Sequence, residues 1–185
     1  MRIQYNAPVT LTFAIICTLV LALSSALPGT ADFFAVSSGK SPTSIGFYFS
    51  LFSHVFGHAN VQHLLGNMSY LLLLGPAIEE KYGSRDLVMM LFVTAVLTGV
   101  FQLIFFSGGL MGASGIVFML ILLSSITNFE KGKIPLTFIL VAALYLGTEI
   151  VHSIQDDQIS QFAHILGGIC GSAFGFWLGK GRKGN

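Results

Sequence analysis

Charged residues are scarce in this sequence. Its 185 residues include only nine Lys and Arg and eight Asp and Glu, or 9% in all, whereas 54% are hydrophobic. A soluble domain carries roughly a quarter charged residues to solvate its surface. The composition therefore excludes an ordinary soluble protein and indicates that most of the surface faces hydrocarbon.

Sheet-like alternation of polar and apolar residues is also missing, and cysteine occurs only at Cys17 and Cys170. A chain that spans a bilayer must form a helical bundle or a closed barrel, and continuous apolar runs favour the bundle. Both cysteines lie inside apolar runs, where a thiol is usually a small buried hydrophobe. They do not indicate a redox compartment.

Long apolar runs fill most of the chain. A spanning helix needs about 20 largely apolar residues, and the qualifying runs cover residues 9–27, 58–78, 86–106, 113–128, 134–152 and 160–179. We expect the first run to be retained as a span rather than cleaved as a signal peptide. The prediction is one all-α membrane domain over residues 1–185. It has a six-transmembrane-helix core at about 9–179, an outer loop at 28–53 and a short cytoplasmic tail at 180–185.

The distribution of Lys and Arg predicts the orientation, because cytoplasmic loops retain positive charge. Only Lys40 lies on one side of the predicted bundle. The opposite side has Arg2, Lys81, Arg85, Lys131, Lys133, Lys180, Arg182 and Lys183. Both termini are therefore predicted to be cytoplasmic, and the loops at 28–53, 107–112 and 153–161 to face outside.

Ser114 stands at the start of the fourth apolar run, after a glycine-rich stretch that includes Gly112. A helix start leaves unpaired N–H groups and a positive dipole end, which suit an anionic intermediate. From Ser114 to Asn128 the helix would be roughly 22 Å long against a hydrocarbon core of about 30 Å. If that helix ends at the cytoplasmic face, it begins inside the membrane. The alternative role for Ser114 is a helix N-cap.

His164 precedes glycines that recur every four residues, at Gly167, Gly171, Gly175 and Gly179. Small residues at this spacing let membrane helices approach closely, and His164 lies on nearly the same face. If the stripe packs against the fourth helix, His164 comes within hydrogen-bonding reach of Ser114. The alternative is a glycine zipper that joins two copies of the chain.

His63 and Asn67 are four residues apart and share a helix face. Both can donate hydrogen bonds, as the side chains of an oxyanion hole do. The alternative is a transition-metal site formed by His54, His58 and His63. Their spacing fits one helix face poorly, and no carboxylate or cysteine joins them.

Three motifs, GASG at 112–115, the His63–Asn67 pair and His164 with its spaced glycines, resemble those of the bacterial rhomboid proteases, in the same order from about 50 to 179. EEKYGSRDL at 79–87 is similar to the family's segment that closes the second helix. The resemblance implies a six-helix rhomboid-like bundle and an intramembrane serine endopeptidase. Ser114 would be the nucleophile and His164 its base, forming an acyl-enzyme. Ser114 N–H, Gly112, His63 and Asn67 would bind the oxyanion and the substrate.

The resemblance also implies the setting of the reaction. The substrates would be transmembrane segments of other proteins, cut in the bacterial inner membrane by a site that opens toward the periplasm. We expect no cofactor, no metal and no nucleic-acid partner. The sequence does not predict the oligomeric state or the roles of His54 and His58.

Some positions depart from the family. The outer loop lacks a Trp-Arg pair, since the only tryptophan is Trp177, and Gly66 stands where some relatives have an aromatic gating residue. Phe118 replaces a tyrosine that often packs on the histidine, and we expect its ring to stack on His164.

Two other functions stay open at this point. One is a catalytically inactive rhomboid-like protein that binds membrane clients, although such relatives generally lack the serine or the histidine. The other is a small transporter, although the spans have no buried carboxylate or lysine and show no inverted repeat.

Overall fold

The computed structural model describes residues 4–126, 133–153 and 158–178, and most of them are helical. The longest helices are α1 (Pro8–Ala26), α4 (Val61–Tyr82), α5 (Ser84–Phe105), α6 (Ser114–Ile126), α7 (Leu136–Ser153) and α8 (Gln158–Leu178). Each falls on one of the predicted apolar runs. The prediction of a mainly helical fold is confirmed. The predicted tail at 180–185 lies outside the described residues.

Two of the described helices, α1 and α5, are long and apolar enough to cross a bilayer, with mean hydropathies of 2.2 and 2.4. The helix α6 is shorter, with 13 residues. Six spans therefore remain a prediction, whereas six helices at the predicted places are a feature of the structure.

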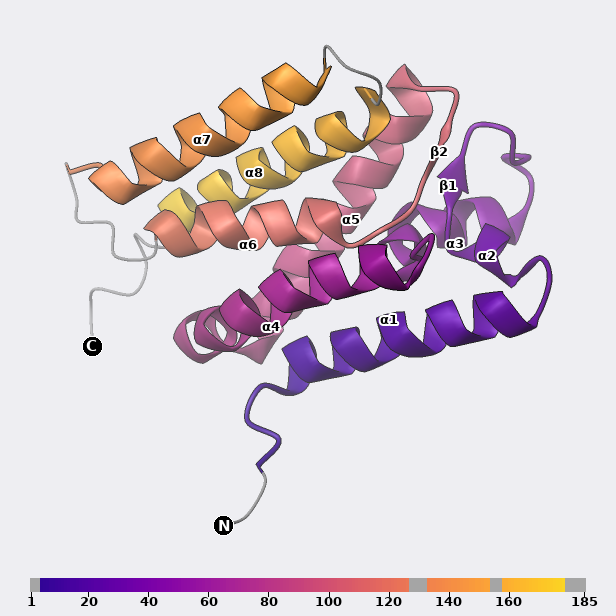
Figure 1. Cartoon of the computed structure of the whole chain (residues 1–185), viewed down its shortest axis with the longest axis horizontal. Helices are drawn as coiled ribbons and strands as arrows, with labels where there is room; N and C mark the ends of the chain where they lie inside the picture. The colour runs from indigo at the N-terminus through magenta and orange to yellow at the C-terminus, as the bar shows by residue number, and fades with distance from the viewer. Residues whose placement is uncertain (1–3, 127–132, 154–157, 179–185) are drawn as a thin grey trace.

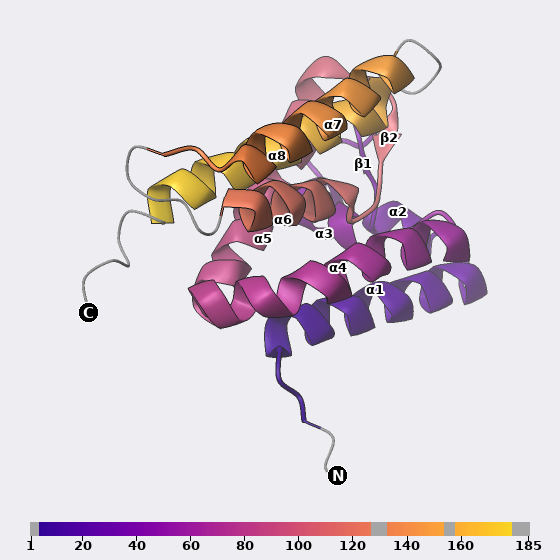
Figure 2. The same cartoon turned by 60° about the vertical axis from the view of Figure 1, so that its left-hand side comes forward.

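The helices lie in three layers with α6 in the middle. In Figure 1, α4 and α1 lie on one side of α6, and α8 and α7 lie on the other. Figure 2 keeps this order, and α6 and α8 form the most extensive helix contact in the described part of the chain. The helix α5 completes the bundle by packing against α3 (Ile45–Ser53), α8 and α4. This arrangement places the start of α6 between α4 and α8.

The ends of α4 differ slightly from the predicted run. Asn60 caps the helix, since its side chain accepts a 2.8 Å hydrogen bond from the His63 N–H, so the helix begins at Val61 rather than at 58. It continues to Tyr82. Gly83 alone separates α4 from α5, with a φ of 86° that suits glycine.

The predicted outer loop has more structure than the sequence indicated. It contains α2 (Thr30–Phe33), β1 (Val36–Ser37) and α3 (Ile45–Ser53), and the 3₁₀ helix η1 (His54–Phe56) follows it directly. The strand β1 pairs antiparallel with β2 (Gly109–Leu110), which lies in the loop just before α6. The absence of sheet predicted from the missing alternation was therefore wrong for these two short strands, because two residues are too few to show a periodicity.

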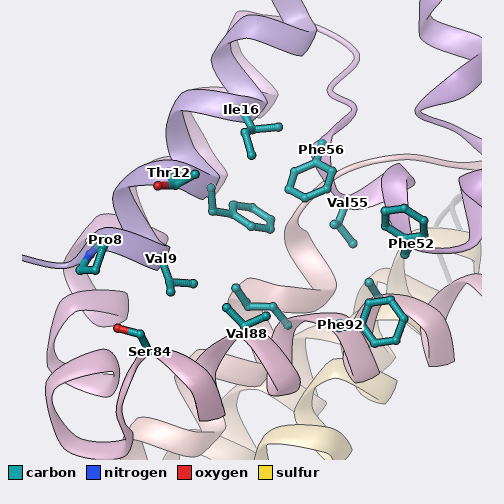
Figure 3. Close-up of a pocket in the computed structure, with 13 residues that line it drawn as sticks. Pro8, Val9, Thr12, Ile16, Phe52, Val55, Phe56, Ser84, Val88 and Phe92 are labelled. Atoms are coloured by element: carbon teal, nitrogen blue, oxygen red, sulfur yellow. The ribbon is translucent and has the colours of Figure 1, made fainter.

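An apolar cavity of about 480 Å³ lies between α1, η1 and α5 (Figure 3). Its walls are Pro8, Val9, Thr12, Phe13, Ile16, Phe52, Val55, Phe56, Ser84, Val88, Leu91, Phe92 and Ala95. None of these side chains is ionisable, so this cavity has no group for acid–base chemistry. The polar candidates named by the sequence lie elsewhere.

Candidate active site

Four candidate residues from three helices line one pocket of about 400 Å³. His63 and Asn67 come from α4, Ser114 from α6 and His164 from α8. The other lining residues are Gln62, Gly66, Tyr70, Leu110, Met111, Val117, Phe118 and Ile121. The fold thus brings together side chains separated by up to about a hundred positions in the sequence.

Ser114 is the first residue of α6. The first turn of a helix has N–H groups without an intrahelical acceptor, and here the Val117 N–H donates to the Ala113 carbonyl at 2.9 Å. The N–H groups at Ser114 therefore precede the hydrogen-bonded part of the helix and lie at its positive end. With 13 residues, α6 is only roughly 20 Å long.

The glycine stripe of α8 packs on α6, a partner that the sequence allowed but did not decide. A Cβ on Gly167 would lie 2.0 Å from the Gly115 carbonyl oxygen, and one on Gly171 would lie 2.2 Å from the Met119 carbonyl oxygen. Backbone therefore meets backbone along this contact, which only glycine allows. Gly179 lies outside the described residues. The contact between α6 and α8 holds His164 beside the start of α6.

The Phe118 ring stacks on His164, as the sequence led us to expect. The ring centroids are 4.2 Å apart and the planes differ by 4°. Phe118 is one helical turn after Ser114, so α6 supplies both the serine and the support for the imidazole. The stack fixes the plane of the ring.

Gly112 lies against the edge of the His63 imidazole. A Cβ at Gly112 would be 2.8 Å from His63 Nε2, and its φ of 129° is one that other residues rarely adopt. Glycine at 112 is thus required twice, by the backbone conformation and by the neighbouring ring. It brings His63 close to the backbone two residues before Ser114.

Asn67 is buried and its amide Nδ2 donates to His58 Nε2 at 3.1 Å. The other ring nitrogen of His58 bonds to the Phe56 carbonyl at 3.2 Å. The His58 and His63 rings meet edge to face with centroids 5.1 Å apart. His58 therefore contacts both members of the His63–Asn67 pair.

His54 has a different environment. Its buried ring has nitrogens 3.2 Å from the Ser50 carbonyl and 3.2 Å from the Thr98 hydroxyl. These partners hold η1 against α5 and keep the ring engaged there. Within the described ranges, His, Cys, Asp and Glu form no group of three that would suit a metal ion.

Sequence reasoning missed the residues that hold the loop before α6. Gln102 is buried in α5 and donates to the Gly108 carbonyl at 3.0 Å, and Ser38 donates to the Ser107 carbonyl at 3.1 Å. Gln102 carried a signal, because a polar amide inside an apolar run needs a partner. Ser38 carried none.

The wall at Gly66 is open. A Cβ there would meet nothing within 4 Å, although the residue lines the pocket. Residue 66, where some relatives have an aromatic gating residue, therefore contributes no side chain to this wall of the pocket.

Comparisons with known proteins assign the chain to a family. The sequence profile described as the Rhomboid domain matches residues 46–181, which is most of the chain. The chain belongs to the rhomboid family. The matched region includes Ser114, His164, His63 and Asn67.

Similar curated proteins are each named rhomboid protease GlpG. The chain is 27% identical to the one from Haemophilus influenzae over 71% of this chain and 70% of the relative. It is 30% identical to the one from Klebsiella pneumoniae (strain 342) over 64% of this chain and 43% of the relative. The one from Yersinia pestis (strain Pestoides F) is 27% identical over 92% of this chain and 62% of the relative. The chain thus spans less than two thirds of the length of the last two relatives.

Proposed function

We propose that this chain is an intramembrane serine endopeptidase that cleaves transmembrane segments of other proteins. The observation that carries the proposal is the single pocket lined by Ser114, His164, His63 and Asn67. A serine, a base and two donors at one point are the groups that acyl transfer requires. Membership of the rhomboid family, whose relatives are named proteases, supports the same reaction.

The reaction would proceed through an acyl-enzyme. Ser114 Oγ attacks the scissile carbonyl while His164 accepts the hydroxyl proton, and the tetrahedral intermediate collapses as His164 protonates the leaving amine. A water molecule then gives a proton to His164 and attacks the ester, and His164 returns that proton to Ser114 Oγ as the new carboxyl end is released. The stack with Phe118 keeps the imidazole in place throughout.

The negative oxygen of the intermediate would be bound by the Ser114 N–H and the side chains of His63 and Asn67. Gly112 supports this arrangement because its bare Cα lets the loop approach His63 closely. Each donor stabilises charge that develops only in the transition state, and loss of one costs roughly 10²–10³-fold in rate.

A substrate helix would enter sideways from the bilayer. The pocket is bounded on α4 by Gly66, where no side chain stands in the way, and by Tyr70 one turn further along. We infer that this open wall admits the unwound end of a transmembrane segment.

The site would face the periplasm from the bacterial inner membrane. Glu79, near the end of α4, accepts hydrogen bonds from the Val9 N–H at the start of α1 and from the Ser84 hydroxyl at the start of α5. Lys81 and Arg85 are therefore at the same end of the bundle as the start of α1. The enrichment of positive charge at that end favours a cytoplasmic location for it.

The direct test is cleavage of a helical membrane substrate by the purified protein in liposomes. Ser114→Ala and His164→Ala should each abolish cleavage, since removal of either residue in a serine protease of another fold costs on the order of 10⁶-fold. A fluorophosphonate probe should label Ser114 in the unmodified protein and fail to label the alanine variant.

Three outcomes would contradict the proposal. Undiminished cleavage by either variant would eliminate the dyad, and inhibition by chelators would favour a histidine–metal site. Substrate binding without any cleavage or labelling would favour a client-binding protein.

A further inference from the structure

We propose that His58 is a positioning residue that orients the side-chain amide of Asn67 toward the oxyanion. This role rests on the proposed function, since it acts through a donor of the proposed anion site. The sequence left His58 unassigned, and the structure gives it two partners that together allow only one arrangement of protons.

The Phe56 carbonyl determines the tautomer of His58. A carbonyl oxygen can only accept, so the His58 Nδ1 that lies 3.2 Å away carries the proton. In the neutral ring Nε2 then has a lone pair and must accept. The atom 3.1 Å from it is Nδ2 of Asn67, which donates.

This acceptor selects one of the two orientations of the Asn67 amide. If the amide were reversed, its carbonyl oxygen would face the Nε2 lone pair with no proton between them. In the orientation that satisfies both groups, Asn67 donates one Nδ2 hydrogen to His58. The second Nδ2 hydrogen is then left for the oxyanion. Nδ2 is 3.8 Å from the place of a Cβ on Gly112, so it lies on the pocket side, beside the loop that leads to Ser114.

Burial makes this hydrogen bond important. His58 is 5% exposed and Asn67 is 7% exposed, so water competes little for either side chain. A buried donor or acceptor without a partner is costly, which holds the pair together. The His58 ring also meets the His63 ring edge to face. This contact limits the positions open to the ring of His63, the other side-chain donor.

The short helix η1 connects both halves of the proposed anion site. Its His54 carbonyl accepts the Gly112 N–H at 2.9 Å, and its Phe56 carbonyl accepts the His58 proton. The Val55 and Phe56 side chains line the apolar cavity of Figure 3. The Phe56 ring packs on Phe13 of α1 with centroids 4.9 Å apart. Three residues thus set the position of Gly112 relative to Asn67.

Two substitutions of similar size separate this role from simple support of the fold. His58→Gln can place an amide oxygen near the former Nε2 and keep an acceptor for Asn67. His58→Asn can place an amide N–H near the former Nδ1 and keep the bond to Phe56, but offers Asn67 nothing. We expect His58→Asn to lower kcat roughly 10–100-fold with KM unchanged. The range is the one typical of metal sites, where removal of a residue that orients a ligand lowers metal affinity or activity by that factor. His58→Gln should retain most of the rate.

The Asn67→Ala background is the matched control. If His58 acts through Asn67, the Gln and Asn variants of His58 should have equal rates once Asn67 is alanine. Equal rates of the two His58 variants when Asn67 is present would overturn the role. The role would also be overturned if His58→Asn lowered the rate by the same factor in the Asn67→Ala background. Detergent unfolding midpoints measured for all variants would reveal a loss caused by unfolding, which would also count against it. If the unmodified chain cleaves no substrate, the proposed function itself fails, and this role with it.

Discussion

At the scale of single residues, the support of His164 by an aromatic ring can be tested separately from the base itself. Phe118 stacks on the imidazole at 4.2 Å and has no hydroxyl with which to hold it. Such a ring pair is worth about 0.5–1.5 kcal/mol. We therefore expect Phe118→Leu, which keeps bulk but not the stack, to lower kcat/KM roughly 2- to 10-fold. Phe118→Tyr should retain the rate, and an unchanged rate in the leucine variant would show that the stack is dispensable.

At the scale of helices, the contact between α6 and α8 depends on backbone approach at the glycine stripe. A methyl group at Gly171 would meet the Met119 carbonyl at 2.2 Å, where no rotamer change can relieve it. Gly168→Ala is the matched control on the same helix, because its Cβ would make ordinary contacts of 3.5–3.6 Å with the Leu122 side chain. We expect Gly171→Ala to lower the free energy of unfolding in detergent by about 1–3 kcal/mol relative to Gly168→Ala, and to reduce cleavage. Equal stabilities would mean that the helices separate without cost.

At the scale of the whole molecule, orientation in the membrane can be measured with introduced cysteines. Cys17 and Cys170 are buried, so background labelling should be low. We expect a membrane-impermeant maleimide to label Ser41→Cys in the outer loop from outside intact spheroplasts. Lys133→Cys, near the start of α7, should react only after permeabilisation. Labelling in the reverse order would mean that the orientation is the opposite one and that the pocket opens on the cytoplasmic side.

Several features were predictable because they depend on local patterns. Apolar runs near the length of a bilayer predicted where the longest helices lie, because a helix that crosses the hydrocarbon core needs a continuous hydrophobic sequence. The four-residue glycine spacing predicted a close helix contact for α8, and the contacts of Gly167 and Gly171 confirm α6 as its partner. The catalytic roles of Ser114 and His164 stay predictions, although both residues line one pocket.

What only the tertiary structure decided depends on residues far apart in the chain. His54 and His58 look alike in the sequence, yet one bonds to Thr98 of α5 and the other to Asn67 of α4. The pairing of β1 with β2 joins segments about seventy residues apart. Such contacts leave no periodic trace, because each is satisfied by a single partner whose nearness results from the packing of whole helices. The sequence alone determined the six longest helices and the chemical groups on them, and the packing determined which groups meet.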